Sequence, residues 1–287
     1  CEPMKRVLVT GTGGQLGRSI QDRAPDHPSL EFLFLDRARL DITNPEQVMQ
    51  VFKDFRPDYC VNCAAYTQVD RAEEEPERCF EINVKGVQNL VEACVAYPCV
   101  LLQISTDFVF DGGKGQPYST EDQPNPINVY GLSKYKGEQV IREGLQDYFI
   151  IRTSWLYSEF GNNFFKTMIR LGAEKDQIRV VDDQTGSPTY AGDLAAFVLF
   201  IIEKESSDYG VFHYSNQGAV TWFEFAKHIL ALNGSGTEVI PIGSDAFGSP
   251  AKRPLNSVLD LDKTKQVFHF KIPVWEERLR ECLKKME

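Results

Sequence analysis

The first half of the chain alternates short apolar runs with longer segments in which apolar residues recur every three or four positions. The short runs predict buried strands at residues 6–10, 31–36, 59–64, 100–106 and 148–153. Between the second and third runs, Asn44 and Pro45 predict a helix start, followed by an apolar face of Val48, Val51, Phe52 and Phe55. Residues 76–96 predict one further helix, with Phe80, Val84, Val87, Val91 and Val95 on its apolar face.

Strands that alternate with helices predict a parallel sheet, because each crossover between parallel strands needs a helix of its own. The strand segments are apolar almost without interruption, which is typical of strands covered by helices on both faces. We therefore predict a doubly wound α/β fold.

The second half of the chain is less regular and predicts a smaller, mixed α/β region. A strand is expected at residues 211–215, and Thr221 with Glu224 forms a capping box before a helix at 222–232. Asn233–Gly234 ends that helix, and a last helix begins near Val274. No linker separates the two regions, so we expect them to pack closely together.

A glycine-rich turn directly follows the first predicted strand and opens the first helix. Gly11, Gly14 and Gly17 allow a tight turn, close approach of the backbone to a pyrophosphate and close packing of helix on strand. The helix start offers free N–H groups to phosphates, with Gln15 and Leu16 in its first turn. The pattern predicts a Rossmann dinucleotide-binding fold in residues 1–154, with a later contribution from about 190–215.

Further cofactor contacts are expected where strands end at the carboxyl edge of the sheet. Asp36 ends the second strand and could accept hydrogen bonds from an adenosine ribose, which favours NAD. Arg37 follows at once and could pair with a 2′-phosphate, which favours NADP, so the choice between NADH and NADPH stays open. The other expected cofactor contacts are Asp41, Ile42, Ala64, Ala65 and Tyr66, and later in the chain Tyr130 and Lys134.

Tyr130 and Lys134 lie four residues apart at the start of a predicted helix, so their side chains share one face. The lysine ammonium, together with an oxidised nicotinamide, is expected to lower the pKa of the tyrosine, and the lysine can also hold the nicotinamide ribose. Thr106 ends the fourth strand, where its hydroxyl can bond a substrate carbonyl and orient it toward Tyr130. These three residues are the predicted catalytic set.

These motifs together resemble the extended short-chain dehydrogenase/reductase family, and within it the dTDP-4-dehydrorhamnose reductases. The resemblance rests on the glycine turn, on the run Ser-Thr-Asp-Phe-Val-Phe-Asp-Gly that begins at Ser105, and on the Tyr-x-x-x-Lys pair. Supporting runs cover most of the chain, among them Arg56-Pro57-Asp58, Val61-Asn62, Arg152-Thr153-Ser154-Trp155, Gly161-Asn162-Asn163-Phe164 and Arg253-Pro254-x-Asn256-Ser257.

The resemblance implies reduction of the C4 ketone of a nucleotide-linked 6-deoxy sugar by NADPH or NADH. In the family a threonine, a tyrosine and a lysine are catalytic, which matches Thr106, Tyr130 and Lys134. Substrate contacts would fall on Thr106, Asp107, Trp155 and Asn163, in residues 155–189 and 216–287 together with the strand ends. Arg152 and Arg253 are the expected positive charges for the diphosphate, although either could form a structural ion pair.

Other functions share these motifs. Sugar-nucleotide epimerases and dehydratases have the same cofactor fold, but the resembling dehydratases carry an Asp-Glu pair where this chain has Asp107-Phe108. The methionine adenosyltransferase β subunit, a regulator without catalysis, also resembles the family. Homodimers are common in it and a divalent cation can lie between subunits, but we find no carboxylate cluster here to which a metal could be assigned.

Composition narrows the class of partner. The chain has 31 lysines and arginines and 41 aspartates and glutamates. The resulting net charge of −10 argues against nucleic acid or an anionic membrane surface as partner. The longest apolar run, at 194–202, is nine residues, whereas a bilayer span needs about 20.

Six of the seven cysteines lie in or beside apolar stretches, which favours free thiols in a reducing compartment and a cytoplasmic protein. Cys60 and Cys63 are expected on opposite faces of a strand, which argues against a redox or metal site. No secretion signal opens the chain, and the tripeptide ahead of Met4 could be a remnant added to the native chain.

Overall fold

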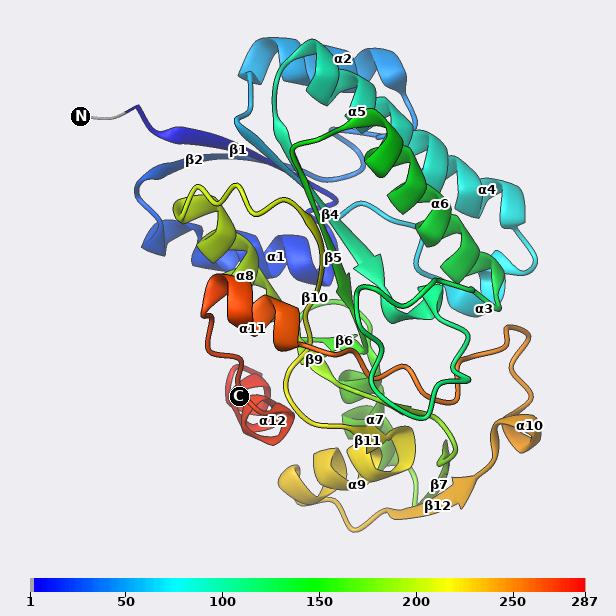
Figure 1. Ribbon diagram of the computed structural model, residues 1–287. Coiled ribbons are helices and arrows are strands. Elements are labelled where there is room, and N and C mark those ends of the chain that lie inside the picture. The colour runs from blue at the N-terminus through cyan, green and yellow to red at the C-terminus, as the bar shows by residue number, and fades with distance from the viewer. Residues whose placement is uncertain (1–2, 287) are drawn as a thin grey trace.

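The computed structural model describes residues 3–286 and has a six-stranded sheet at its centre (Figure 1). Its strands are, in spatial order, β10 (Gly210–His213), β5 (Tyr148–Thr153), β4 (Val100–Thr106), β3 (Tyr59–Asn62), β1 (Lys5–Thr10) and β2 (Leu30–Leu35). Every neighbouring pair is parallel. The strand order reverses between β1 and β3, and open parallel sheets bind ligands at such a point, beyond the carboxyl ends. The predicted doubly wound fold is confirmed.

Helices cover both faces of this sheet, and alternate residues of each strand point into different cores. Val7 and Val9 lie in a core with α1 (Gln15–Arg23), α8 (Ala191–Glu203) and α11 (Asp262–Phe268). Leu8 lies in the core on the other face, with α2 (Pro45–Phe55), α5 (Val87–Ala96) and α6 (Val129–Gly144). This arrangement explains why the strand segments are apolar throughout, because neither face meets water.

The helix expected over residues 76–96 is not uniform, so that prediction is wrong in its middle part. It consists of α4 (Pro76–Phe80), a π-helical segment at Glu81–Gly86, and α5. Inside the π segment, the Asn83 side chain accepts from the Tyr66 N–H (2.8 Å) and donates to the Tyr66 carbonyl (3.0 Å). Such bulges insert an extra residue into a helical turn and are frequent at functional sites.

The strand ends also differ from the prediction. Asp36 and Ala64 lie beyond β2 and β3, and β10 ends at His213. Shorter connecting elements are the 3-10 helices Ala24–Asp26 and Asp107–Val109 and the single-turn helix α3 (Val69–Ala72).

The remaining elements form a second, mixed α/β layer with its own apolar core. Its helices are α7 (Phe164–Glu174), α9 (Trp222–Leu232), α10 (Ser244–Phe247) and α12 (Trp275–Lys284). Its strand pairs are β6 (Leu156–Tyr157) with β9 (Thr189–Tyr190), β7 (Gln177–Val181) with β12 (Glu238–Ile242), and β8 (Thr185–Gly186) with β11 (Val220–Thr221).

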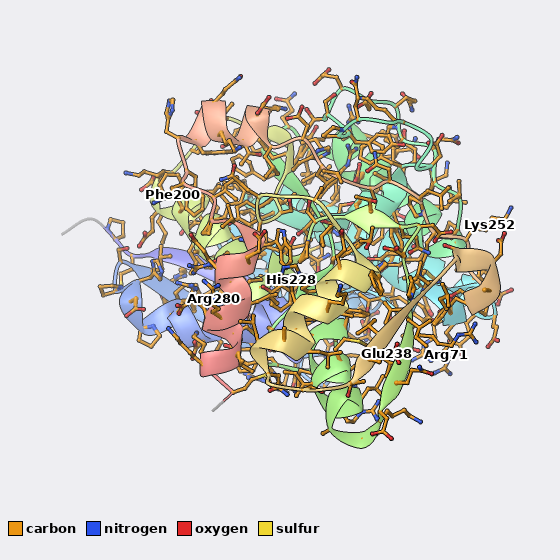
Figure 2. The ribbon with its side chains drawn as sticks, turned by 90° about the horizontal axis from the view of Figure 1, so that it is seen from below. Arg71, Phe200, His228, Glu238, Lys252 and Arg280 are labelled. Atoms are coloured by element: carbon orange, nitrogen blue, oxygen red, sulfur yellow. The ribbon has the colours of Figure 1, made fainter. Side chains whose placement is uncertain are left out.

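Within this layer the predicted capping box is confirmed, since the Thr221 side chain and the Glu224 side chain each bond the other's backbone N–H. His228 points from α9 toward α12 (Figure 2), where its ring lies 4.9 Å from that of Trp275.

The cysteines that the structure describes are all free: Cys60, Cys63, Cys79, Cys94, Cys99 and Cys282. Cys1, the seventh predicted free thiol, lies outside the described residues. Cys60 packs into the core on the α2 side and Cys63 against the core on the α1 side, so their predicted placement on opposite faces is confirmed. Among residues 3–286, no helix has the length and apolar character needed to cross a bilayer.

Candidate active site

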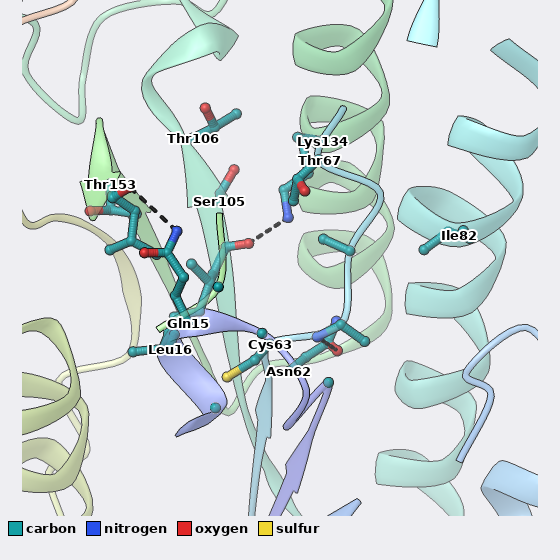
Figure 3. Close-up of a pocket in the computed structure, with 18 of the residues that line it drawn as sticks. Gln15, Leu16, Asn62, Cys63, Thr67, Ile82, Ser105, Thr106, Lys134 and Thr153 are labelled. Atoms are coloured by element: carbon teal, nitrogen blue, oxygen red, sulfur yellow. Dashed lines mark hydrogen bonds between the residues drawn. The ribbon is translucent and has the colours of Figure 1, made fainter. Parts of the chain in front are cut away.

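The carboxyl ends of β1, β3, β4 and β5 open onto a cleft of about 720 Å³ (Figure 3). Most of the residues that the sequence nominated line it: Gly11, Gly14, Gln15, Leu16, Gly17, Arg37, Asp41, Ile42, Ala64, Ala65, Thr106, Asp107, Tyr130, Lys134, Trp155 and Asn163. Four nominated residues do not line it: Asp36, Tyr66, Arg152 and Arg253.

The glycine turn has the geometry that a dinucleotide needs. Gly11 adopts φ +64°, and a Cβ there would lie 2.5 Å from the backbone nitrogen of Ala64. A Cβ on Gly17 would lie 2.6 Å from Thr12 Cα, so helix α1 packs closely on the turn only because glycine stands there. Gly14 precedes α1 without a side-chain cap, and the first turn of α1 holds no acidic residue. The free N–H groups at this end of the helix therefore fit a pyrophosphate.

Gln15 connects this turn to the second layer. Its amide oxygen accepts from Ser158 Oγ (2.8 Å) and from Asn163 Nδ2 (3.1 Å). Asn163 also caps α7, since its Oδ1 accepts from the Lys166 N–H at 3.0 Å. Asn163 thus lines the cleft while its amide is already bonded within the chain, and its first effect is to hold the α7 end beside α1.

Asp36 and Arg37 both follow β2, but only Arg37 lines the cleft. Asp36 Oδ1 accepts from the Arg39 N–H (3.1 Å), and its carboxylate belongs to the turn rather than to the cleft. Arg37 is exposed and lines both the cleft and a neighbouring pocket of about 160 Å³. Tyr66 lies in that second pocket, and its hydroxyl donates to Glu75 Oε2 (3.1 Å). Asp36 and Tyr66 are therefore not where we expected cofactor contacts.

The three predicted catalytic residues converge at the end of β4. Helix α6 starts at the Asn128 cap, and a Cβ on Gly131 would overlap the carbonyl oxygen of Phe108, so the helix lies directly against the segment after β4. Lys134 Nζ donates to the carbonyl oxygen of Ile104 (2.6 Å), as Figure 3 shows. Thr106 and Tyr130 also line this cleft, and Thr106 Oγ1 accepts from the Phe108 N–H at 3.1 Å.

Burial controls the protonation of both groups on α6. It raises the pKa of Tyr130 well above the usual value for a tyrosine, and the Thr106 side chain opposes this. It lowers the pKa of Lys134 to about 8, with the Glu138 carboxylate opposing. The expected lowering of the Tyr130 pKa is thus wrong for the chain by itself, because desolvation dominates and the ammonium is bonded to a backbone carbonyl. At neutral pH Tyr130 carries its proton and can donate it.

Asp107 borders the cleft beside Thr106 and is only 3% exposed. Its Oδ1 accepts from Thr106 Oγ1 (3.2 Å), and its Oδ2 has no hydrogen-bond partner within the described residues. Burial raises the pKa of this carboxyl to about 7. A buried oxygen without a partner is costly, so Asp107 is a suitable partner for a hydroxyl that enters the cleft.

Trp155 stands between the cleft and the second core. Its backbone adopts φ +48°, a left-handed conformation that a bulky residue rarely takes and that is found at ligand sites. The indole stacks on Trp222 with ring centroids 3.5 Å apart, and Trp222 Nε1 donates to Gln184 Oε1 (3.2 Å). Trp155 is therefore fixed at the wall of the cleft, where the prediction had it.

Neither arginine expected to bind a diphosphate lines the cleft. Arg152 is 1% exposed and donates to both Glu138 oxygens (2.9 and 2.7 Å), so its expected role in binding the diphosphate is wrong. Arg253 donates to both oxygens of Asp70 (2.8 and 3.0 Å). Both are structural ion pairs, as the alternative interpretation of the sequence had it.

Several lining residues were not nominated from the sequence: Asn62, Cys63, Thr67, Ile82, Thr153 and Ser154. Thr153 and Ser154 follow β5, and the rule that ligands lie at carboxyl ends could have found them. Asn62 continues a row of polar side chains across the sheet, accepting from Thr10 Oγ1 (2.7 Å) and donating to Gln103 Oε1 (2.7 Å). Ile82 lies in the π-helical segment, which gave no signal in the sequence.

The family resemblance raised the question of a divalent cation. Residues 3–286 contain no group of three or more His, Cys, Asp or Glu side chains arranged to hold a metal ion.

Comparisons with known proteins agree with this geometry. The family model described as RmlD substrate binding domain matches residues 4–287. A dTDP-4-dehydrorhamnose reductase from Aggregatibacter actinomycetemcomitans is 42% identical, over 96% of this chain and 98% of its own. A dTDP-4-dehydrorhamnose reductase from Bacillus anthracis, solved in complex with NADP, is 42% identical with a TM-score of 0.94, covering 98% of this chain and 99% of that one. A UDP-glucose 4-epimerase from Thermus thermophilus, solved with NAD, is 22% identical with a TM-score of 0.84 over 98% of each chain, and it shares the fold. This chain therefore belongs to the dTDP-4-dehydrorhamnose reductase family of oxidoreductases.

Proposed function

We propose that this chain reduces the C4 ketone of dTDP-4-dehydro-L-rhamnose to dTDP-L-rhamnose with NADPH or NADH. The observation that carries the proposal is the meeting of Thr106, Tyr130 and Lys134 at the end of β4, in the cleft that the uncapped start of α1 also borders. The sugar nucleotide is the substrate named by the relatives. Residues 1–154 and about 190–215 would bind the cofactor, and 155–189 with 216–287 the sugar nucleotide.

Each side chain has one task in this reaction. A bound NADPH or NADH supplies the hydride. Tyr130, which is protonated at neutral pH, gives its proton to the carbonyl oxygen as negative charge develops there. Thr106 hydrogen-bonds the same oxygen and orients the ketone. Lys134 carries a positive charge within the cleft and can hold the nicotinamide ribose, while Asp107 and Trp155 contact the sugar nucleotide.

The alternative functions are less well supported. A dehydratase needs a second acid-base group after the threonine, and Phe108 follows Asp107 at that place. A purely regulatory subunit has no need of a tyrosine, a lysine and a threonine on one cleft.

The direct test is turnover by the purified chain. We expect dTDP-4-dehydro-L-rhamnose and NADPH to be consumed together, with dTDP-L-rhamnose identified by NMR as the product. Oxidation of the cofactor without that product would point to another keto sugar. Interconversion of sugar-nucleotide epimers without net oxidation of the cofactor would favour an epimerase. Binding of a synthetase with no turnover of any keto sugar would favour the regulator.

We propose that Arg37 binds the 2′-phosphate of NADPH, because this exposed arginine lines the cleft, whereas Asp36 does not line it and accepts from the Arg39 N–H. In Arg37→Gln we expect the KM for NADPH to rise on the order of tenfold with the KM for NADH little changed, since a charge-assisted hydrogen bond contributes about 1.5–3 kcal/mol. Steady-state kinetics with each cofactor checks this. Arg39→Gln is the matched control, because Arg39 is exposed on the same turn but lines neither pocket. Equal effects on both cofactors would contradict the assignment.

We also propose a cytoplasmic location and a homodimer. Free buried cysteines support the first, because disulfides form in oxidising compartments. The molar mass of the purified protein, measured by light scattering, tests whether it is a homodimer.

A further inference from the structure

Three side chains on one face of α6 meet three consecutive residues at the end of β4. Tyr130, Lys134 and Glu138 follow each other at intervals of four, which places them in one row along the helix. Along this row, Thr106 lines the cleft with Tyr130, the carbonyl of Ile104 accepts from Lys134, and Ser105 donates to Glu138. The reaction uses the first two pairs, whereas the third pair has no part in the mechanism above.

Glu138 is fully buried and fully bonded. Its Oε1 accepts from Ser105 Oγ (2.5 Å) and from Arg152 Nε (2.9 Å), and its Oε2 accepts from Arg152 Nη2 (2.7 Å). Its exposed fraction is 0% and that of Arg152 is 1%. A bidentate arginine pair of this kind fixes the carboxylate in both position and orientation.

Arg152 is itself held from the far side. Its Nη1 lies 3.3 Å from His213 Nε2, and since a guanidinium only donates, Nε2 is the acceptor. His213 Nδ1 then carries the hydrogen and donates to the carbonyl of Tyr118 (3.0 Å). Burial lowers the pKa of His213 to about 3, so the ring stays neutral. Elements β5, β10 and the loop at Tyr118 thus converge on Glu138.

We propose that Glu138, held by Arg152, is a positioning residue: it fixes α6 against the end of β4 and holds a negative charge one helical turn from Lys134. This inference rests on the proposed function, because a charged Lys134 matters for reductase chemistry. Glu138 touches neither the reacting atoms nor the cleft, and it acts through Lys134 and Ser105.

The groups that face Lys134 come from three elements. They are Glu138 on α6, Cys79 on α4 and Cys63 after β3. Burial raises the pKa of Cys63 to about 12, and it also raises that of Cys79, so both thiols are neutral near pH 8. Glu138 therefore supplies the main negative charge that opposes the desolvation of Lys134.

The test is the pH dependence of kcat/KM in Glu138→Gln, which keeps the shape of the side chain and removes its charge. Losing the carboxylate lowers the pKa of Lys134 further, so the lysine loses its charge at a lower pH than in the wild type. We therefore expect the alkaline limb of the kcat/KM profile, where activity declines, to move down by on the order of 1 pH unit. Glu143→Gln is the matched control, since Glu143 is exposed on the same helix, and its limb should stay in place. Glu138→Asp should restore most of the wild-type profile.

Two further measurements separate the possible causes. Glu138→Gln combined with Arg152→Met removes the unpaired guanidinium, and the limb should remain shifted because the carboxylate is still missing. Variants that lose stability and kcat while the limb stays at its wild-type pH would overturn the proposal. The affinity for NADPH, followed by fluorescence across the same pH range, reports on Lys134 without turnover. If the wild type fails to turn over, the proposed function fails, and an unshifted NADPH profile in Glu138→Gln would separately refute the positioning role.

Discussion

Tyr130→Phe should lose reductase activity while keeping its fold and its cofactor. The substitution removes only the phenol hydroxyl, and the ring can keep its edge contact with Phe108, at 6.1 Å between centroids and an interplanar angle of 81°. Without a proton donor for the forming alkoxide, kcat should fall on the order of 10² or more, the scale of a lost general acid. Single-turnover oxidation of NADPH in the presence of the keto sugar measures this directly.

Binding distinguishes the two ways in which this variant could fail. The affinity for NADPH should stay close to wild type, because the glycine turn and the start of α1 are unchanged. Thr106→Val is the companion variant: it keeps Tyr130 but removes the hydroxyl that orients the ketone, and a smaller loss is expected. Wild-type kcat in Tyr130→Phe would refute the assignment of Tyr130 as the acid, whatever happens to Thr106→Val.

The pH dependence of the wild type follows from the same groups. The pKa of Tyr130 is raised, so this donor stays protonated throughout the neutral range and does not limit activity there. The pKa of Lys134 is about 8, so its charge is lost above that pH, and the alkaline limb belongs to the lysine. The sequence spacing of Tyr130 and Lys134 correctly brought them to one helical face, but burial, which decides both pKa values, could not be seen in that spacing.

The parts of the fold that could be predicted are those specified by local chemistry. The glycine turn after β1, the Thr221 capping box and the apolar strand segments each depend on residues close in sequence. The π-helical segment at Glu81–Gly86 could not be predicted, because it exists where Asn83 turns inward to bond the backbone of Tyr66, a contact between segments 17 residues apart.

The two arginines that we expected to bind the diphosphate show the same limit of prediction from sequence. A sequence gives the charge of Arg152 and Arg253 but not their partners, Glu138 and Asp70, which lie 14 and 183 residues away. Asp36 stays a predicted ribose contact, but it does not line the cleft, since a carboxylate at a strand end bonds either a ribose or the N–H groups of its own turn. Only the path of the chain beyond β2 decides between the two.

Arg152→Met should cost the protein a large part of its stability. The variant leaves the Glu138 carboxylate at 0% exposure with Ser105 as its remaining side-chain partner, and it also removes the guanidinium that lies 5.2 Å from the Phe110 ring. Breaking a buried ion pair from one side costs about 3–5 kcal/mol, against a total free energy of unfolding of about 5–15 kcal/mol. Urea denaturation followed by circular dichroism measures the loss.

The cause of that loss can be isolated by removing both charges. Arg152→Met combined with Glu138→Leu leaves no buried charge behind, and replacement of a buried pair by apolar groups is often neutral or stabilising, so the double variant should be more stable than Arg152→Met alone. Arg170→Met is the matched control, because Arg170 forms an ion pair with Glu174 at 2.9 Å while 59% exposed, and such pairs contribute about 0–1 kcal/mol. If Arg152→Met unfolds at the same urea concentration as Arg170→Met, the pair with Glu138 does not stabilise the fold. If the double variant is no more stable than the single one, the loss comes from packing around Phe110 and His213 and not from an unpaired charge.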